Sequence, residues 1–275
     1  MFGHNTIVGR KFFRESPEAA IGKLLVTSIF STIQGEGPFA GVPAVFVRLT
    51  YCQYACHFCD TFFDSGDWMY PREVISKAVE SCRGGPVPKL LVVTGGEPTL
   101  QTSALLSLLM LALDRFSDTQ IETNGLLAPA VPDATTVVVS PKCAELAGAV
   151  RPYAELPVGT LTRADCLKFV MCDDPQSPYS EVPYWALAWR EKTGRAIYVS
   201  PMAQYNHPPG ATQRMYDARR DPDIAERTAA ERISFWEPNL LDMERCQRNY
   251  EYAAKYVMRY DLQLSIQQHL FASLP

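Results

Sequence analysis

Three cysteines stand close together in the sequence, at Cys52, Cys56 and Cys59, directly after the apolar segment AVFVRLT. A loop of this length can bring three thiolates to three corners of one iron–sulfur cubane, and no fourth cysteine lies nearby. Iron–sulfur clusters that only transfer electrons normally have four protein ligands. The spacing therefore predicts a 4Fe–4S cluster with one iron left open for another molecule.

An open iron is what an enzyme that cleaves S-adenosylmethionine (SAM) needs, because the amino and carboxylate groups of SAM chelate it. One electron then breaks a carbon–sulfur bond and releases a 5′-deoxyadenosyl radical, while the protein orients the cofactor. We expect no catalytic side chain beyond that radical. The alternative is zinc bound by the three cysteines and His57, but structural zinc sites usually combine two short-spaced ligand pairs. Because the chain has no second pair, zinc is the less favoured interpretation.

Short apolar, β-branched segments alternate with segments of helical periodicity, which predicts an α/β fold with a mainly parallel sheet. We expect helices at 72–82, at 103–116 with Ser103 as N-cap, and at 243–260. The expected strands are Ala44–Leu49, Lys89–Val93, Thr119–Glu122, Thr136–Val139, Cys166–Met171, Ala196–Val199 and Leu262–Ile266.

Polar motifs follow four of these strands at the points where they end. They are Gly95-Gly96-Glu97-Pro98, Thr123-Asn124-Gly125, Ser140-Pro141-Lys142 and Gln267-Gln268-His269. Ligands bind at the carboxyl ends of the strands in parallel α/β sheets. Turn residues alone would explain any single motif, but four at four strand ends predict one binding rim.

Length and composition favour one domain over 1–275, with 1–26 as an N-terminal extension and 203–242 as an inserted loop or lid. The net charge is −4 and no long basic run occurs, so nucleic-acid binding is not expected. No apolar run approaches the ~20 residues that span a bilayer. The first twenty residues lack the apolar segment of a secretory signal, which predicts a cytoplasmic protein.

With these motifs in view, the chain resembles the radical SAM superfamily and, within it, the 7-carboxy-7-deazaguanine synthases. The CxxxCxxC and GGEP motifs are shared across the superfamily, whereas several other segments are narrower. The resemblance rests on Ile33–Gly37, Gly41–Ala44, Phe46–Leu49, Cys52–Thr61, Gly95–Pro98, Ile121–Thr123, Val139–Lys142, Lys168 and the terminal segment LSIQQHLFASLP. The sequence departs from the family pattern at Tyr51, Ser200-Pro201 and Leu270.

The resemblance implies a shortened, partial (β/α) barrel and a ring-contracting lyase. Such an enzyme converts 6-carboxy-5,6,7,8-tetrahydropterin to 7-carboxy-7-deazaguanine with loss of ammonia, in queuosine and deazapurine biosynthesis. It also implies a 4Fe–4S cluster, catalytic use of SAM, Mg²⁺, a flavodoxin- or ferredoxin-like electron donor and a homodimer. Two rival functions stay open, a glycyl-radical-enzyme activase and a non-catalytic metal-binding protein.

By the same resemblance, the functional residues fall into three groups. The metal ligands would be Cys52, Cys56 and Cys59 for the cluster and Thr61 for Mg²⁺. The SAM contacts would be Phe58, Gly95, Gly96, Glu97, Thr123, Ser140 and Lys142. The pterin contacts would be Gln34, Glu36, Arg48 (for the substrate carboxylate), Gln267, His269 and Pro275. Taken alone, Arg48 is equally typical of an exposed strand end, Thr61 of a helix N-cap and Lys142 of a solvated surface.

Overall fold

The computed structural model describes residues 7, 9, 12–13, 21–54, 56–61, 63–82, 85–146, 149–205, 241–272 and 274. In these residues a sheet of nine strands has the order β11-β10-β9-β6-β5-β4-β2-β1-β3. The strands are β1 (Leu24–Ile33), β2 (Pro43–Leu49), β3 (Asp67–Met69), β4 (Leu90–Gly95), β5 (Asp118–Thr123), β6 (Thr135–Val139), β9 (Cys166–Met171), β10 (Ile197–Pro201) and β11 (Gln263–Leu264). A separate ribbon joins β7 (Ala144–Leu146) to β8 (Ala149–Arg151).

The strands from β2 to β11 in this order pair in parallel, and only β1 and β3 are antiparallel to their neighbours. Because β3 and β11 lie at opposite edges and do not pair with each other, the sheet stays open. The predicted α/β fold with a mainly parallel, partial barrel is therefore confirmed.

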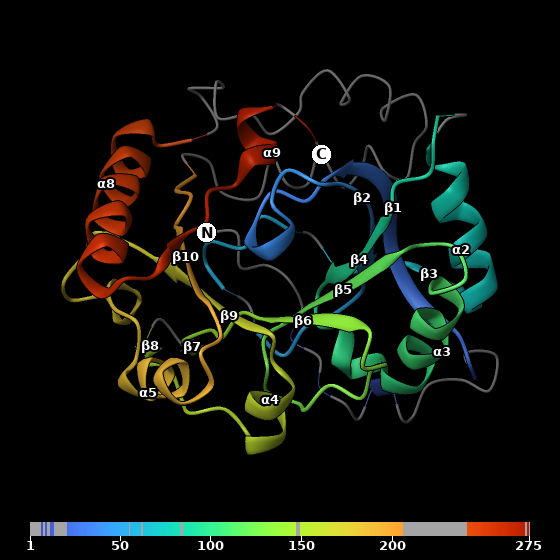
Figure 1. The fold of residues 1–275 in the computed structure, drawn as a ribbon, viewed down its shortest axis with the longest axis horizontal. Coiled ribbons are helices and arrows are strands. Elements are labelled where there is room, and N and C mark those ends of the chain that lie inside the picture. The colour runs from blue at the N-terminus through green and yellow to red at the C-terminus, as the bar shows by residue number, and fades with distance from the viewer. Residues whose placement is uncertain are drawn as a thin grey trace.

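Helices cover the outer face of the sheet. They are α2 (Pro71–Glu80), α3 (Thr102–Ala112), α4 (Val158–Arg163), α5 (Tyr184–Thr193) and α8 (Met243–Tyr260), while the short α9 (Gln268–Phe271) follows β11. Figure 1 shows them at the periphery, with α2 and α3 on one side of the molecule and α5 and α8 on the other. The main core lies between the helices and the sheet, where side chains of the sheet such as Val47 and Val93 share one cluster with Leu108 of α3. The hydrophobic effect of this burial stabilises the fold.

The inner face of the sheet is different in character. Side chains of a strand alternate between its two faces, so Ala44, Phe46 and Arg48 lie opposite the side chains that face the helices. The apolar part of this face is a small cluster of Ala44, Phe46, Leu90 and Val92. Beyond this apolar cluster, toward the carboxyl ends of the strands, the residues of the inner face are polar. The fold thus directs polar side chains to one end of an open, curved sheet.

Several predicted element boundaries need correction. Ser103 is not an N-cap, because α3 begins at Thr102 directly after a 3-10 turn and has Gln101 at the cap position. The helix also ends at Ala112 rather than at 116. The last strand is only Gln263–Leu264. We did not predict β1, β3, α4 or α5, and β1 begins inside the predicted 1–26 extension.

Most of the two irregular regions lies outside the described residues. Of the 1–26 extension, Ile7 forms a bridge with Cys52, and Phe12 packs against Tyr51 with ring centroids 4.9 Å apart. At the ends of the 203–242 segment, Tyr205 and Leu241 form an antiparallel bridge, so these ends lie side by side. No helix in the described part is long and apolar enough to cross a membrane.

Candidate active site

A cavity of about 190 Å³ opens at the carboxyl ends of the parallel strands. Strands β2, β4, β5, β6, β9 and β10, or the loops that follow them, contribute side chains to its wall. The predicted site residues that line it are Glu36, Cys52, Cys56, Phe58, Cys59, Thr61, Gly95, Gly96, Thr123, Ser140, Lys142 and Gln267. The structure therefore brings together residues that the sequence analysis assigned to metal, SAM and pterin.

All three cysteines of the motif border this cavity. Burial raises the pKa of Cys52 to about 11 and that of Cys56 to about 12, and it raises the pKa of Cys59 well above its ordinary value. Within the described residues, no three His, Cys, Asp or Glu side chains are gathered closely enough to hold a metal ion. The cluster itself therefore stays a prediction, supported by the shared cavity.

The cysteine loop is fastened to the end of β4 by backbone hydrogen bonds. The N–H groups of Gly96 and Glu97 donate to the carbonyls of Leu49 and Tyr51, at 2.8 and 2.7 Å. A Cβ atom at Gly95 would overlap the backbone of Leu49, and one at Gly96 would overlap the backbone of Tyr51. Gly95 also has a φ of +110°, in a region that only glycine adopts readily. The two glycines are therefore required for the close approach of these segments.

Glu97 lies behind the cavity wall rather than in it. Its side chain is fully buried, and its carboxylate accepts hydrogen bonds from the backbone N–H and hydroxyl of Thr99, the hydroxyl of Thr123 and the backbone N–H of Asn124. Because four donors already occupy its two oxygens, Glu97 joins the ends of β4 and β5. The contact between Glu97 and the SAM amino group stays a prediction.

Three of the other predicted SAM contacts, Thr123, Ser140 and Lys142, line the cavity at the ends of β5 and β6, while Phe58 lines it from the cysteine loop. Thr123 lies at the end of β5, and Lys142 donates from Nζ to the hydroxyl and carbonyl of Ser140, at 2.6 and 2.7 Å. The ring of Phe58 packs edge-on against Tyr179. His57 instead turns toward Glu145, whose carboxylate lies 3.0 Å from Nδ1, which is consistent with a role as a loop residue.

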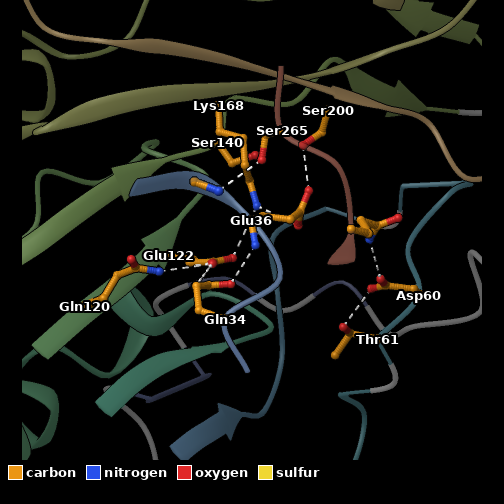
Figure 2. A network of polar contacts seen from close by, with 12 residues as sticks. Gln34, Glu36, Asp60, Thr61, Gln120, Glu122, Ser140, Lys168, Ser200 and Ser265 are labelled. Atoms are coloured by element: carbon orange, nitrogen blue, oxygen red, sulfur yellow. Dashed lines mark hydrogen bonds and ion pairs between the residues drawn. The ribbon is translucent and has the colours of Figure 1, made fainter. Parts of the chain in front are cut away.

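A buried polar network joins four segments deeper in the site (Figure 2). Lys168 on β9 lies with Nζ 3.0 Å from Oε2 of Glu36 and 3.5 Å from Oε2 of Glu122. The hydroxyl of Ser200 donates to Oε1 of Glu36 at 2.6 Å, and the amide of Gln34 donates to Oε1 of Glu122 at 2.9 Å. The amide of Gln120 also reaches Oε1 of Glu122.

Charge pairing sets the pKa values in this network. Burial alone would raise the pKa of Glu36, but Lys168 and Ser200 more than offset it, so the pKa lies below its usual value. Burial would lower the pKa of Lys168, but Glu122 and Glu36 raise it above its usual value. Both directions agree on an ionised pair.

Two predicted contacts approach the site from other directions. Arg48 is half-buried on the inner face of β2, with its guanidinium 4.7 Å from the ring centroid of Phe30. Thr61 lines the cavity and donates from Oγ1 to Asp60 at 3.0 Å. Burial lowers the pKa of Arg48, whereas Asp60 and Glu122 act in the opposite direction. These two carboxylates are therefore the acidic surroundings of the arginine.

The C-terminal tail packs onto the loop that follows β1. The hydroxyl of Ser265 accepts from the N–H of Gly37 at 3.0 Å, and the N–H of Gln268 donates to the carbonyl of Gly35 at 3.2 Å. His269 packs so closely that a Cβ on Gly35 would overlap its ring. Gln267 lines the cavity and reaches Asp60 at 3.3 Å. Pro275 lies outside the described residues.

The sequence analysis assigned no role to several residues that line this site, among them Asp60, Glu122, Lys168 and Ser200. Lys168 and Glu122 stood within the motifs of the resemblance but received no role. A lysine in the middle of the apolar strand CLKFVM was a usable signal, because a charge is rarely fully buried without a partner. Ser200, which departs from the family pattern, contacts Glu36 directly.

No family model matches the chain, but individual relatives do. It is 32% identical over 243 residues to the 7-carboxy-7-deazaguanine synthase of Rhodospirillum rubrum, covering 84% of this chain and 92% of the relative. It is 35% identical over 175 residues to that of Rickettsia prowazekii, covering 62% and 69%. The chain belongs to the 7-carboxy-7-deazaguanine synthase family. The predicted family is thereby confirmed.

The fold agrees with this assignment. The crystal structure of QueE from Escherichia coli superposes with a TM-score of 0.56 and 20% sequence identity, covering 93% of this chain and all of that one. At this identity the match shows a common fold. Membership of this family, which the relatives show, confirms the predicted enzyme, a lyase of the radical SAM type, and disfavours a non-catalytic binding protein.

Proposed function

We propose that this chain converts 6-carboxy-5,6,7,8-tetrahydropterin to 7-carboxy-7-deazaguanine with loss of ammonia, using SAM and a 4Fe–4S cluster. The observation that supports this most directly is the single cavity at the strand ends, which three cysteines, Lys142 and Glu36 all line. The family supplies the reaction, and the cavity supplies residues suited to it.

The donor set fits an iron–sulfur cluster with an open position. Cys52, Cys56 and Cys59 are the only cysteines among the described residues that line the cavity, so three thiolates are available and a fourth is not. When bound, the cluster would supply the electron that cleaves SAM. Gly96, without a side chain, lets the cysteine loop pack closely against the end of β4, and Lys142 supplies a cation.

Mg²⁺ fits the part of the cavity wall that lies beside Cys59, in the same loop. It is a hard ion that prefers oxygen ligands, and Thr61 offers a hydroxyl next to the carboxylate of Asp60. In this proposal the hydroxyl oxygen of Thr61 is a ligand of Mg²⁺.

The pterin is expected to lie between the buried network and the C-terminal tail. Its 2-amino and ring N–H groups are donors, and Glu36 is an ionised acceptor at the cavity wall. Arg48 suits the substrate carboxylate, because a planar guanidinium can form two parallel hydrogen bonds with it. Gln34 donates to Glu122 and accepts from the backbone N–H of Glu36. Gln267 lines the cavity from the tail, and His269, which packs against Gly35, would close the pocket beside it.

The deciding experiment is anaerobic reconstitution with iron and sulfide, followed by incubation with SAM, a reductant and 6-carboxytetrahydropterin. We expect about four irons per chain, release of ammonia and formation of the deazaguanine without net loss of SAM. Replacement of any one of the three cysteines by alanine should abolish SAM cleavage. A colourless protein with one zinc per chain, or SAM consumed stoichiometrically with a partner protein, would contradict the proposal.

The remaining expectations follow from the proposed chemistry. A single-electron donor of the flavodoxin or ferredoxin type is needed to start each SAM cleavage. The homodimer and the cytoplasmic location stay predictions, which a sedimentation experiment and a fractionation experiment would test.

A further inference from the structure

Lys168 has the most unusual surroundings of any charged residue in the buried network. Its side chain is 6% exposed, yet it lies within ion-pair distance of two carboxylates that come from distant parts of the chain. Glu36 belongs to the loop after β1, Glu122 to β5 and Lys168 to β9, so one ammonium joins three segments around the cavity (Figure 2). Burying charges is costly unless they are paired.

In both carboxylates, Lys168 binds one oxygen and neutral donors bind the other. At Glu36, Lys168 reaches Oε2 and Ser200 reaches Oε1. At Glu122, Lys168 reaches Oε2, while Gln34 and Gln120 reach Oε1. An ionised carboxylate has about four acceptor positions, so neither group is saturated by these contacts. Each keeps acceptor capacity, and both residues line the cavity.

The charge state of these carboxylates decides what they can recognise. Ionised, they only accept hydrogen bonds, which matches a ring edge that presents N–H and amino donors. Protonated, one of them would offer an O–H toward those donors. Two carboxylates so close together would repel each other without a counter-ion. Lys168 is the cation that lies between them.

We propose that Lys168 is a positioning residue for the pterin, holding Glu36 and Glu122 ionised and oriented so that they accept hydrogen bonds from the donor edge of the substrate. This inference rests on the proposed function and deepens it. Lys168 acts through the two carboxylates and not by contact with the reacting atoms. It thereby favours a ring with adjacent N–H and amino donors over one that presents acceptors there.

The test measures binding of pterin-6-carboxylate, an aromatic analogue, to the reconstituted holoenzyme with SAM, together with kcat and KM for the tetrahydropterin. Lys168→Met should raise the Kd at least 30-fold, which is about 2 kcal/mol. KM should rise with it, while iron content and uncoupled SAM cleavage stay at wild-type values. Lys168→Arg should recover most of the affinity, because a guanidinium can still bridge two carboxylates. The exposed Lys77→Met on α2 is the matched control and should change nothing.

A double-mutant cycle separates positioning from direct contact. In a Glu36→Gln and Glu122→Gln background, the amides have no charge to balance, so adding Lys168→Met should change the Kd less than threefold. A full additional loss in that background would mean that Lys168 contacts the substrate itself and would overturn the inference. If Lys168→Met does not fold in the otherwise wild-type chain, the Kd is compared with and without Lys168→Met in the amide background. That background leaves no unpaired carboxylate in the network.

The result also separates this inference from the proposed function. A wild-type enzyme that neither binds the pterin nor turns it over contradicts the function. A wild-type enzyme that does both, with Lys168→Met binding as tightly, contradicts only the role of Lys168.

Discussion

Arg48 illustrates how much a single side chain depends on its position on the strand. It follows Ala44 and Phe46 on the inner face of β2, where its guanidinium lies over the ring of Phe30. Cation–π contacts of this kind hold the side chain without using its hydrogen-bond donors. Arg48 is therefore held in place while its N–H groups can still bind a carboxylate.

We predict that Arg48→Ala loses pterin turnover but keeps its cluster and some uncoupled SAM cleavage. Loss of a charge-assisted pair in a buried site should weaken substrate binding by roughly 2–5 kcal/mol. Arg48→Lys should not restore it, because an ammonium cannot form two parallel hydrogen bonds. The exposed Arg72→Ala serves as the control. Substrate affinity equal to wild type in Arg48→Ala would assign the residue another role.

Thr61 provides a prediction about the metal at the same scale. Thr61→Val keeps the shape of the side chain but removes the oxygen, so stimulation of turnover by Mg²⁺ should weaken markedly. Thr61→Ser keeps the oxygen and should behave as wild type. The measurement is the rate as a function of Mg²⁺ concentration. An unchanged Mg²⁺ dependence in the valine variant would show that the ion binds elsewhere.

Among the elements, the turn after β4 has the tightest steric requirement. Gly96 lies against the backbone of Tyr51, and Tyr51 itself has a φ of +68°, unusual for a residue with a side chain. The turn and the cysteine loop are thus fitted to each other through backbone atoms, which cannot move aside as a side chain can.

Gly96→Ala should therefore destabilise the fold by roughly 1–3 kcal/mol and reduce the iron that the chain retains. Thermal unfolding and iron content after reconstitution measure the two effects. Gly9→Ala is the matched control, because a Cβ at Gly9 meets nothing within 4 Å in the described part of the chain. Wild-type stability and iron content in Gly96→Ala would mean that the turn relaxes without cost.

The C-terminal tail is the second element with a specific consequence. Gln268 and His269 contact Gly35, and Gln267 reaches the cavity. Chain ends usually fray, so these contacts indicate a tail that forms part of the pocket.

A chain that ends after Ile266 should keep its cluster and SAM binding but lose pterin affinity roughly tenfold or more, about 1.4 kcal/mol. The cysteines and the SAM-side residues come from earlier segments, which the truncation leaves intact. A bulky C-terminal tag on the full chain should have a similar but smaller effect. Full pterin turnover by the truncated enzyme would show that the tail is only a terminus.

For the molecule as a whole, the buried ion pair links stability to pH. The pKa of Glu36 is lowered below its ordinary value of 4.5 by Lys168 and Ser200, which outweigh the opposing effect of burial. The folded chain therefore binds fewer protons at this group than the unfolded chain does. The stability that it contributes is complete above about pH 4.5 and is lost as pH falls through the lowered pKa.

We predict that the difference in thermal midpoint between wild type and Glu36→Gln narrows as the pH is lowered from 6 to 3. Both proteins share every other titrating group, so the comparison isolates Glu36. A difference that stays constant over this range would mean that Glu36 is not an ionised partner of Lys168.

Local pattern was enough to predict much of this protein. The helix at 243–260 was predicted with the boundaries it has, because its apolar positions recur with helical spacing. The parallel strands were predicted within about two residues at each end, because short apolar runs between turn residues are typical of strands buried on both faces. From the strand ends it followed that the polar motifs would meet at one rim, and twelve of the predicted residues line one cavity there.

Long-range packing decided the rest. The cysteine spacing pointed to a cluster, but only the folded chain places Glu97 behind the wall and the tail against Gly35. Lys168 and Glu36 are 132 positions apart, and Ser200 and Glu36 are 164 apart. Hydrophobic periodicity depends on residues that are close in the sequence, so it cannot predict ion pairs and hydrogen bonds between residues this far apart. They arise because the open sheet brings β5, β9, β10 and the loop after β1 around one space, where buried charges must find partners.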